Sequence, residues 1–172
     1  MNIQNISRKI ATSAAAAAAL VLLTPAAGQA APSPESTYIH LVNRNSGRCL
    51  EIDDNSGEDG ARVQQWTCLG QEASQWHLHP TGPDGRQVQI RSRRHPDMCL
   101  EVAHGGTRNG ARVQTWGCVD GAAEQQWVIG DGVIRNHATG KALEIADSDT
   151  EDGARAQQWE YEGADTQIWY VD

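Results

Sequence analysis

Hydrophobic and polar residues alternate over short stretches along the chain after residue 37, and turn-forming residues separate these stretches. Alternation with a period of two is typical of β-strands that bury one face, and no stretch after Ala30 sustains a helical period. In the first third of the chain, the breaks contain Gly, Asn, Asp and Ser, which favour tight turns. The pattern there predicts strands at 39–43, 48–52, 62–66 and 75–79.

The pattern occurs three times. Each copy begins with Leu-Glu-Ile or Leu-Glu-Val, continues with Gly-Ala-Arg and a first Trp, and ends at a second Trp. The leucines of the three copies, Leu50, Leu100 and Leu143, lie 50 and 43 residues apart, which is the length of a supersecondary unit. No unit of four strands can bury its own apolar face. The sequence therefore predicts an all-β fold, a closed β-trefoil of twelve strands in three pseudo-threefold repeats.

Strand parity divides each repeat into a core face and an outer face. In the first repeat Leu50 faces the core and Glu51 faces outward. In the following strand Val63 has core parity, whereas Gln64 and Trp66 point to the opposite side. A carboxylate, an amide and an indole are therefore expected to converge on the outer side of each repeat.

One column does not fit this division, because its members have core parity and are polar. Two interpretations remain open for it: the strand is bulged at this point, or this edge of the sheet lies at a solvated rim. The residues concerned are Gln65, Thr115 and Gln158.

The four cysteines follow the repeat. In two copies a cysteine precedes Leu-Glu and another follows 19 positions later, while the third copy has Ala142 and Tyr161 at these places. Four cysteines allow three connectivities, and the joint loss of both members favours pairing within a repeat. A zinc site is the alternative, but the short Cys-x-x-Cys spacings typical of one are absent. We predict no metal site and the disulfides Cys49–Cys68 and Cys99–Cys118.

The first thirty residues have the features of a secretory signal peptide. Arg8 and Lys9 precede an apolar stretch at 10–23 that is too short to span a bilayer, and Gly28-Gln29-Ala30 offers a cleavage site. Nothing later is apolar for long enough to cross a membrane. We expect a secreted monomer. Its predicted organisation is a signal peptide at 1–30, a flexible arm at 31–37 and one trefoil domain at 38–172, with repeats at about 38–80, 81–130 and 131–172.

The chain is acidic, with a formal net charge of −8, and cleavage of the signal removes Arg8 and Lys9 and leaves it more so. Binding to phosphates requires a basic face from which counterions are released. The charge therefore argues against a nucleic-acid or anionic-membrane partner.

Together, these motifs resemble the ricin-type lectin domain, the Gln-x-Trp β-trefoil of plant toxins and bacterial secreted proteins, over residues 38–172. The resemblance implies up to three shallow carbohydrate pockets, one per repeat. Each pocket in that family uses an acid after the Cys-Leu step, a Gln two residues before an aromatic, that aromatic, and a polar pair ahead of the last Trp. The carbohydrate-binding residues implied here are the acids Glu51, Glu101 and Glu144, the amides Gln64, Gln114 and Gln157, the aromatics Trp66, Trp116 and Trp159, and Glu124, Gln125 and Gln167 from the polar pairs.

Two departures from the family pattern bear on these sites. The usual acid is Asp, and a Glu moves the carboxylate outward by about one C–C bond, roughly 1.5 Å. The first repeat also has Ser74 where the others have Gln125 and Gln167. The second repeat is therefore predicted to form the best site.

Structural roles compete with binding roles at several of these positions. The second Trp of each repeat (Trp76, Trp127 and Trp169) is expected in the core. The first Trp either stacks on a ligand or packs against a loop. Glu51 and its equivalents either bind a ligand or pair with Arg62 and its equivalents across the strands.

Three classes of function fit a chain of this kind. The leading prediction is a secreted, non-catalytic lectin that binds glycans or polysaccharides without a cofactor and acts by avidity. An enzyme is disfavoured, because no nucleophile elbow, Ser/His/Asp order or metal motif is present. The alternative is an exported trefoil of the inhibitor or toxin-partner type, which has lost sugar binding and contacts a protein through its loops.

Overall fold

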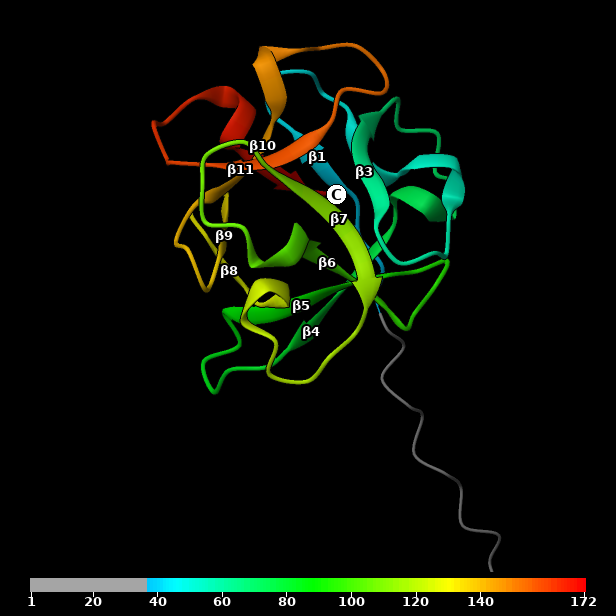
Figure 1. Cartoon of the computed structure of the whole chain (residues 1–172). Coiled ribbons are helices and arrows are strands. Elements are labelled where there is room, and N and C mark those ends of the chain that lie inside the picture. Colours follow the sequence, from blue (N-terminus) through cyan, green and yellow to red (C-terminus); the bar gives the residue numbers. More distant parts are fainter. Residues whose placement is uncertain (1–36) are drawn as a thin grey trace, which may run out of the picture. The chain divides into compact units, whose positions relative to one another are not determined.

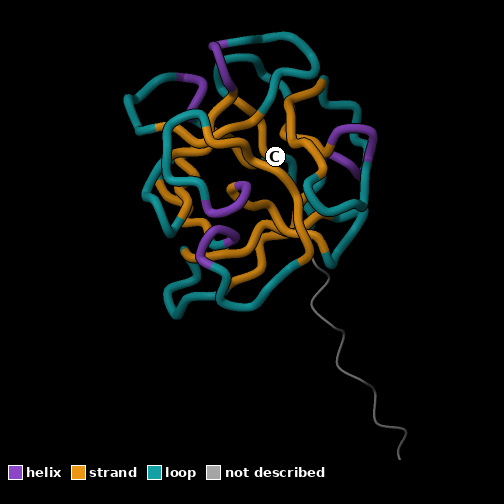
Figure 2. The backbone as a smooth tube through the Cα atoms, in the orientation of Figure 1, coloured by secondary structure: helices purple, strands orange, loops and turns teal. Residues whose placement is uncertain are grey.

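A computed structural model describes residues 37–172, so the predicted signal peptide and nearly all of the predicted arm lie outside the described residues. The described part contains twelve strands and six single-turn 3-10 helices, which lie in the connections between strands (Figures 1 and 2). None of its helices is long and apolar enough to cross a membrane. The strands are β1 (Leu41–Asn43), β2 (Cys49–Ile52), β3 (Ala61–Trp66), β4 (Trp76–Pro80), β5 (Gln87–Ser92), β6 (Met98–Val102), β7 (Ala111–Gly117), β8 (Trp127–Gly130), β9 (Val133–Asn136), β10 (Ala142–Ile145), β11 (Ala156–Trp159) and β12 (Trp169–Val171). The 3-10 helices are η1 (Asp53–Asn55), η2 (Glu72–Ser74), η3 (Ala103–Gly105), η4 (Ala123–Gln125), η5 (Ala146–Ser148) and η6 (Asp165–Gln167).

Six of the strands form a closed ring. β1 pairs with β12, β4 with β5, β5 with β8, and β8 with β9. Two further contacts complete the ring: a bridge between Ile39 and Trp76 links the chain entering β1 to β4, and the Trp169 N–H donates to the Gly132 carbonyl at 2.8 Å. A closed ring leaves no unpaired sheet edge for another chain to extend.

The other six strands form three hairpins, β2–β3, β6–β7 and β10–β11, with the same register in each repeat. The second strands of these hairpins pair with one another. β7 pairs with both β3 and β11 (Figure 1). An isolated bridge joins Gln64 of β3 to Arg155 next to β11. This architecture confirms the predicted β-trefoil. The four strands predicted for the first repeat are all present, and their ends differ from the prediction by at most two residues.

The second tryptophan column lies in the core, as predicted. Trp76 and Trp127 are fully buried and Trp169 is 3% exposed. Each indole N–H donates to the carbonyl of the leucine in its own repeat, at 2.9 Å for Leu50 and Leu100 and 3.0 Å for Leu143. A large apolar ring whose one polar atom is satisfied can be buried at low cost. These bonds fasten the barrel strand to the hairpin of the same repeat.

The polar residues with core parity are neither bulged nor at a wet rim, so both sequence interpretations are wrong. Gln65 lies opposite Leu50 in regular register and is fully buried. Its Nε2 donates to the Asp149 and Glu151 carbonyls at 3.0 and 2.9 Å, and its Oε1 accepts from the Ser46 hydroxyl at 2.7 Å. The side chain therefore satisfies the backbone of the loop of the third repeat, which has no strand to pair with.

Gln158 has the same role toward the loop of the second repeat. It donates to the Gly106 carbonyl at 2.6 Å and accepts from the Thr139 hydroxyl at 2.7 Å. The third member of the column, Thr115, is too short to reach across, and its buried hydroxyl has no partner among the described residues. Two members of the column, Gln65 and Gln158, are therefore clamps, by which we mean buried side chains that bond the loop of another repeat. The third, Thr115, is not.

Both predicted disulfides are present. Cys49 is bonded to Cys68 and Cys99 to Cys118, and each pair is 19 positions apart. In the third repeat the Arg135 guanidinium lies over the Tyr161 ring, 4.3 Å from its centroid. A cation–π contact thus occupies the place where the other repeats have a covalent bridge.

Replacing Gln65 by Ala is expected to lower the free energy of unfolding by about 2–3 kcal/mol, because two loop carbonyls and a hydroxyl lose their partner in a buried place. Thr115→Ala is the matched control in the same column and is expected to cost less than about 1 kcal/mol. Urea unfolding of both variants measures the difference. Equal losses would contradict a stabilising role for the Gln65 hydrogen bonds.

Replacing Cys99 and Cys118 together by Ala is expected to cost on the order of 3 kcal/mol, because the bridge restricts the unfolded chain. Peptide mapping of the unreduced protein provides the check on connectivity. A peptide joining Cys49 to Cys118 would contradict the pairing.

Candidate functional site

Each hairpin places an acid and an amide side by side on the outer face. Glu51 lies directly opposite Gln64 in the β2–β3 register, and the equivalent residues are opposite each other in the other two hairpins. Directly opposed residues in an antiparallel pair have neighbouring side chains. The acid and the amide expected from strand parity to converge are therefore neighbours in all three repeats.

The acids are nearly buried: Glu51, Glu101 and Glu144 are 7%, 6% and 9% exposed. Each carboxylate accepts hydrogen bonds from two amides. For Glu101, Gln114 Nε2 donates to Oε1 at 2.8 Å and Gln125 Nε2 donates to Oε2 at 3.0 Å. The third repeat has the same arrangement, with distances of 2.9 Å from Gln157 and 2.6 Å from Gln167 to Glu144.

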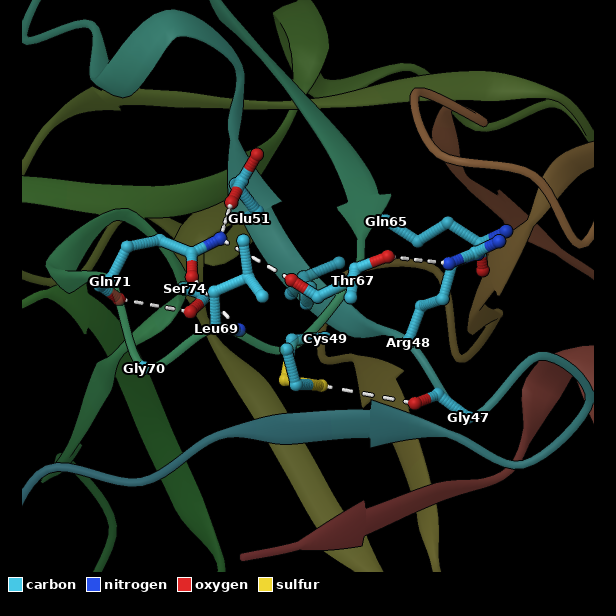
Figure 3. Close-up of a disulfide and its surroundings, with 12 residues drawn as sticks. Gly47, Arg48, Cys49, Glu51, Gln65, Thr67, Leu69, Gly70, Gln71 and Ser74 are labelled. Atoms are coloured by element: carbon cyan, nitrogen blue, oxygen red, sulfur yellow. Dashed lines mark hydrogen bonds between the residues drawn. A yellow bond between two sulfur atoms is a disulfide. The ribbon is translucent and has the colours of Figure 1, made fainter.

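In the first repeat the second amide comes from an unexpected position. Ser74 occupies the column of Gln125, but Gln71, three residues earlier, reaches Glu51 Oε2 at 2.5 Å (Figure 3). Gln71 Oε1 accepts the Leu69 N–H at 3.0 Å, just as Gln125 Oε1 accepts that of Val119 at 2.8 Å. The amide from the hairpin, Gln64, makes a longer contact of 3.5 Å with Glu51.

Ser74 in this column therefore does not leave Glu51 without a second amide. Reading the repeat column by column misses Gln71, because the side chain reaches the same point from a different place in the turn. The only signal for it in the sequence is a glutamine elsewhere in the same short turn. Because Gln71 supplies the second amide, the presence of Ser74 is no longer a reason to rank the second repeat above the first.

The acids do not pair with the arginines of the neighbouring strand. Among residues 37–172, none of the ion pairs involves Glu51, Glu101 or Glu144. Arg62 instead donates to the carbonyl of Gly153 in the adjacent repeat. The structural partners of the acids are therefore amides and not arginines.

The first tryptophan column is open to solvent beside two of the acids. Trp66 and Trp116 are each 37% exposed. Trp66 lines a pocket of about 550 Å³ together with Glu51 and Leu69, and Trp116 lines one of about 240 Å³ together with Glu101 and Val119, as well as Glu124 and Gln125. Leu69 and Val119, which are 73% and 53% exposed, add apolar surface next to the indoles.

The third repeat differs at the same place. Trp159 is half-buried, and the position equivalent to Leu69 and Val119 is Glu162, whose N–H donates to Gln167 Oε1 at 2.9 Å. The position that is apolar in the first two repeats therefore carries a charged residue in the third.

A glycine from the preceding repeat lies against each of these tryptophans. A Cβ on Gly60 would lie 3.8 Å from the Trp116 ring, and one on Gly110 would lie 3.7 Å from the Trp159 ring. Gly153 lies against Trp66 in the same way, at 4.0 Å. The φ angles of the three glycines are between +80° and +88°, which residues with a Cβ rarely adopt. The glycine of the Gly-Ala-Arg motif therefore leaves room for the indole of the next repeat to pack against the loop.

A polar contact accompanies each glycine. The residue before the glycine accepts the N–H of the residue that follows the tryptophan in the next repeat. Asp59 Oδ1 accepts that of Gly117 at 2.8 Å, Asn109 Oδ1 that of Glu160 at 3.0 Å, and Asp152 Oδ1 that of Thr67 at 2.7 Å. The three loops are thus fastened in a cycle.

Burial raises the pKa of the Glu51 carboxyl above its ordinary value of 4.5. The hydrogen bonds from Gln71 and Gln64 lower the pKa and so oppose this effect, whereas the negative charges of Asp152 and Asp53 add to it. Each carboxylate oxygen of this column receives one amide hydrogen bond and has the capacity to accept another. The carboxylate can therefore accept hydrogen bonds from the hydroxyl groups of a ligand that stacks on the neighbouring tryptophan. Among the described residues, no cluster of three or more His, Cys, Asp or Glu side chains could hold a metal ion.

Residues 37–169 match the family model of the ricin-type β-trefoil lectin domain, and the chain belongs to this family. A designed threefold-symmetric protein, ThreeFoil, is 33% identical with a TM-score of 0.73, covering 78% of this chain and 96% of its own. An exo-β-1,3-galactanase of Clostridium thermocellum is 31% identical with a TM-score of 0.73, over 80% of this chain and 30% of the galactanase. The agglutinin of Abrus precatorius is 22% identical with a TM-score of 0.65, over 83% of this chain and 51% of the agglutinin, and shows the fold alone. No curated protein matches.

Replacing Gln71 by Ala is expected to raise the pKa of Glu51 further, because one of the two amides that stabilise its ionised form is lost. A carboxyl group with a raised pKa in the folded state costs stability as the pH rises from 4.5 through that folded pKa. We therefore expect Gln71→Ala to destabilise the protein by about 1–3 kcal/mol above this window, and by less below it.

Carbon-detected NMR titration of the carboxyl groups and urea unfolding against pH test this. Gln75→Ala removes an amide from the same turn that does not bind Glu51, and it is the control. An unchanged Glu51 titration in Gln71→Ala would contradict the assignment.

Proposed function

We propose that this protein is a secreted, non-catalytic lectin that binds polysaccharides through the outer faces of its repeats. The observation that carries the proposal is the half-exposed indole beside a fixed carboxylate, each in an open pocket of the first and second repeats. Sugar rings present an apolar C–H face and a rim of hydroxyls. An indole matches the first and a carboxylate with spare acceptor capacity matches the second.

The amide network supports this function by holding the carboxylate in place before a ligand arrives. In the second repeat, Gln114 and Gln125 each bond one carboxylate oxygen of Glu101. A group that is already ordered loses little conformational entropy on binding. Although Glu is one methylene longer than Asp, the acids of this column do not extend into solvent, since these residues are at most 9% exposed.

Multivalency would supply the affinity. A shallow sugar site typically has a dissociation constant near 1 mM, or about −4 kcal/mol. Sites on one rigid body raise the affinity for a polymer by about 10²- to 10⁴-fold through effective concentration. We therefore expect function on polysaccharides and cell surfaces rather than on free monosaccharides. The two disulfides and the predicted signal peptide support export, because such bridges persist in oxidising compartments.

Replacing Trp116 by Ala is expected to abolish the second site and to reduce retention on a polysaccharide by more than one third, because the sites act together. The triple change at Trp66, Trp116 and Trp159 is expected to abolish retention. Affinity electrophoresis over a panel of polysaccharides measures this. The panel includes a β-1,3-galactan, because the galactanase with a similar trefoil is named for that substrate.

Tyr170→Ala is the matched control, because it removes an exposed aromatic ring that lies outside the described pockets. Urea unfolding confirms that each variant folds. Failure of the folded wild-type protein to bind any member of the panel would favour the protein-binding trefoil.

A further inference from the structure

The pockets of the first and second repeats share a backbone but differ in charge. Each acid is followed by a 3-10 turn whose middle residue has a left-handed φ, 51° at Asp54 and 54° at His104. The residue before it is Asp53 in the first repeat and Ala103 in the second. The same local structure therefore carries two additional carboxylates in one pocket and a histidine in the other.

The carboxylates of the first pocket are only partly compensated. Glu72 and Arg94 both line the pocket, and Glu72 lies 3.4 Å from Arg94 and 3.6 Å from Arg93, so these charges are paired. Within residues 37–172 the other three acids that line the pocket have no Lys, Arg or His nitrogen within 4.0 Å. These are Glu51, Asp53 and Asp54.

The loop that carries Asp53 and Asp54 is held by contacts along its length. The His95 ring nitrogen Nε2 lies 3.0 Å from the Asn55 carbonyl oxygen, and a Cβ on Gly57 would lie 2.8 Å from the His95 ring. At the far end of the loop, Asp59 is held by the Gly117 N–H. The backbone that carries Asp53 and Asp54 is therefore held in place, and both residues line the same pocket as Trp66.

The ligand that fits has a cation attached to a ring with an apolar face. A protonated amine offers three donors to the carboxylates and is attracted to the face of an indole, while the ring itself stacks on Trp66 and Leu69. An anionic sugar would be repelled by the same charges. We propose that the first-repeat pocket selects glycan units that carry a free, protonated amine. This inference rests on the proposed lectin function and adds the class of sugar unit.

A reciprocal exchange between the repeats tests the proposal. Asp53→Ala/Asp54→His gives the first pocket the residues of the second, and Ala103→Asp/His104→Asp does the reverse. Both pairs of residues already occur on this backbone, so the fold is expected to survive. The probes are an oligomer of glucosamine and the same oligomer fully N-acetylated, which differ in charge at the amine. Binding is followed by calorimetry and by the NMR signals of the Trp66 and Trp116 indole N–H groups.

Wild-type protein is expected to bind the amine form about fivefold more tightly than the acetylated form at low salt, and the difference is expected to shrink as salt is added. The preference disappears in Asp53→Ala/Asp54→His, while the acetylated oligomer still shifts the Trp66 signal. In Ala103→Asp/His104→Asp a preference appears at Trp116. Asp147→His, in the third repeat, leaves the preference at Trp66 unchanged.

Equal binding of the two oligomers by wild-type protein overturns the proposal, and so does a preference that persists in Asp53→Ala/Asp54→His. If neutral polysaccharides bind at Trp66 without any preference for the amine, only the inference on the sugar class fails. If no glycan of either set binds the folded protein, the lectin function and this inference fail together.

Discussion

The carboxylate held by two amides is the interaction on which the rest of each repeat depends. One amide comes from the hairpin strand and the other from the turn that follows it, so the acid joins two segments with no backbone pairing between them. The second amide also accepts a backbone N–H of its own turn, at 2.8 Å in the second repeat. Removing water from a carboxylate is costly unless hydrogen bonds replace it. The network therefore stabilises the fold and, with the same atoms, fixes the floor of the pocket.

The requirement for satisfied polar groups can be met by different residues in different repeats. Gln125 and Gln167 reach their acids from one column, whereas Gln71 does so from another. Only the final positions of the donor atoms matter to the buried carboxylate, and the turn allows two routes to them. The clamps of Gln65 and Gln158 follow the same logic, since each provides hydrogen bonds to loop carbonyls that no strand satisfies.

Much of the architecture could be predicted from the sequence because it depends on periodicity. Strand parity placed Leu50 in the core and Glu51 beside Gln64, and the repeat identified both disulfides. The errors arose where a side chain makes a contact that its column does not encode. Gln65 was assigned to a bulge or a rim because parity describes the strand alone, and its partners lie 84 and 86 positions away. The pocket charges of Asp53 and Asp54 are visible in the sequence, but their lack of a partner is known only from the fold.

The cycle of loop contacts makes the order of the repeats along the chain unimportant to the finished molecule. Asp59, Asn109 and Asp152 each hold the following repeat, and the last of them holds the first. The two ends of the domain are already adjacent, since His40 and Asp172 exchange backbone hydrogen bonds at 2.8 and 3.1 Å. Joining these ends and opening the chain between any two repeats would leave every such contact intact. The three repeats therefore form a closed cycle in which the chain termini could lie between any two of them. No repeat can detach without breaking its contacts with both neighbours.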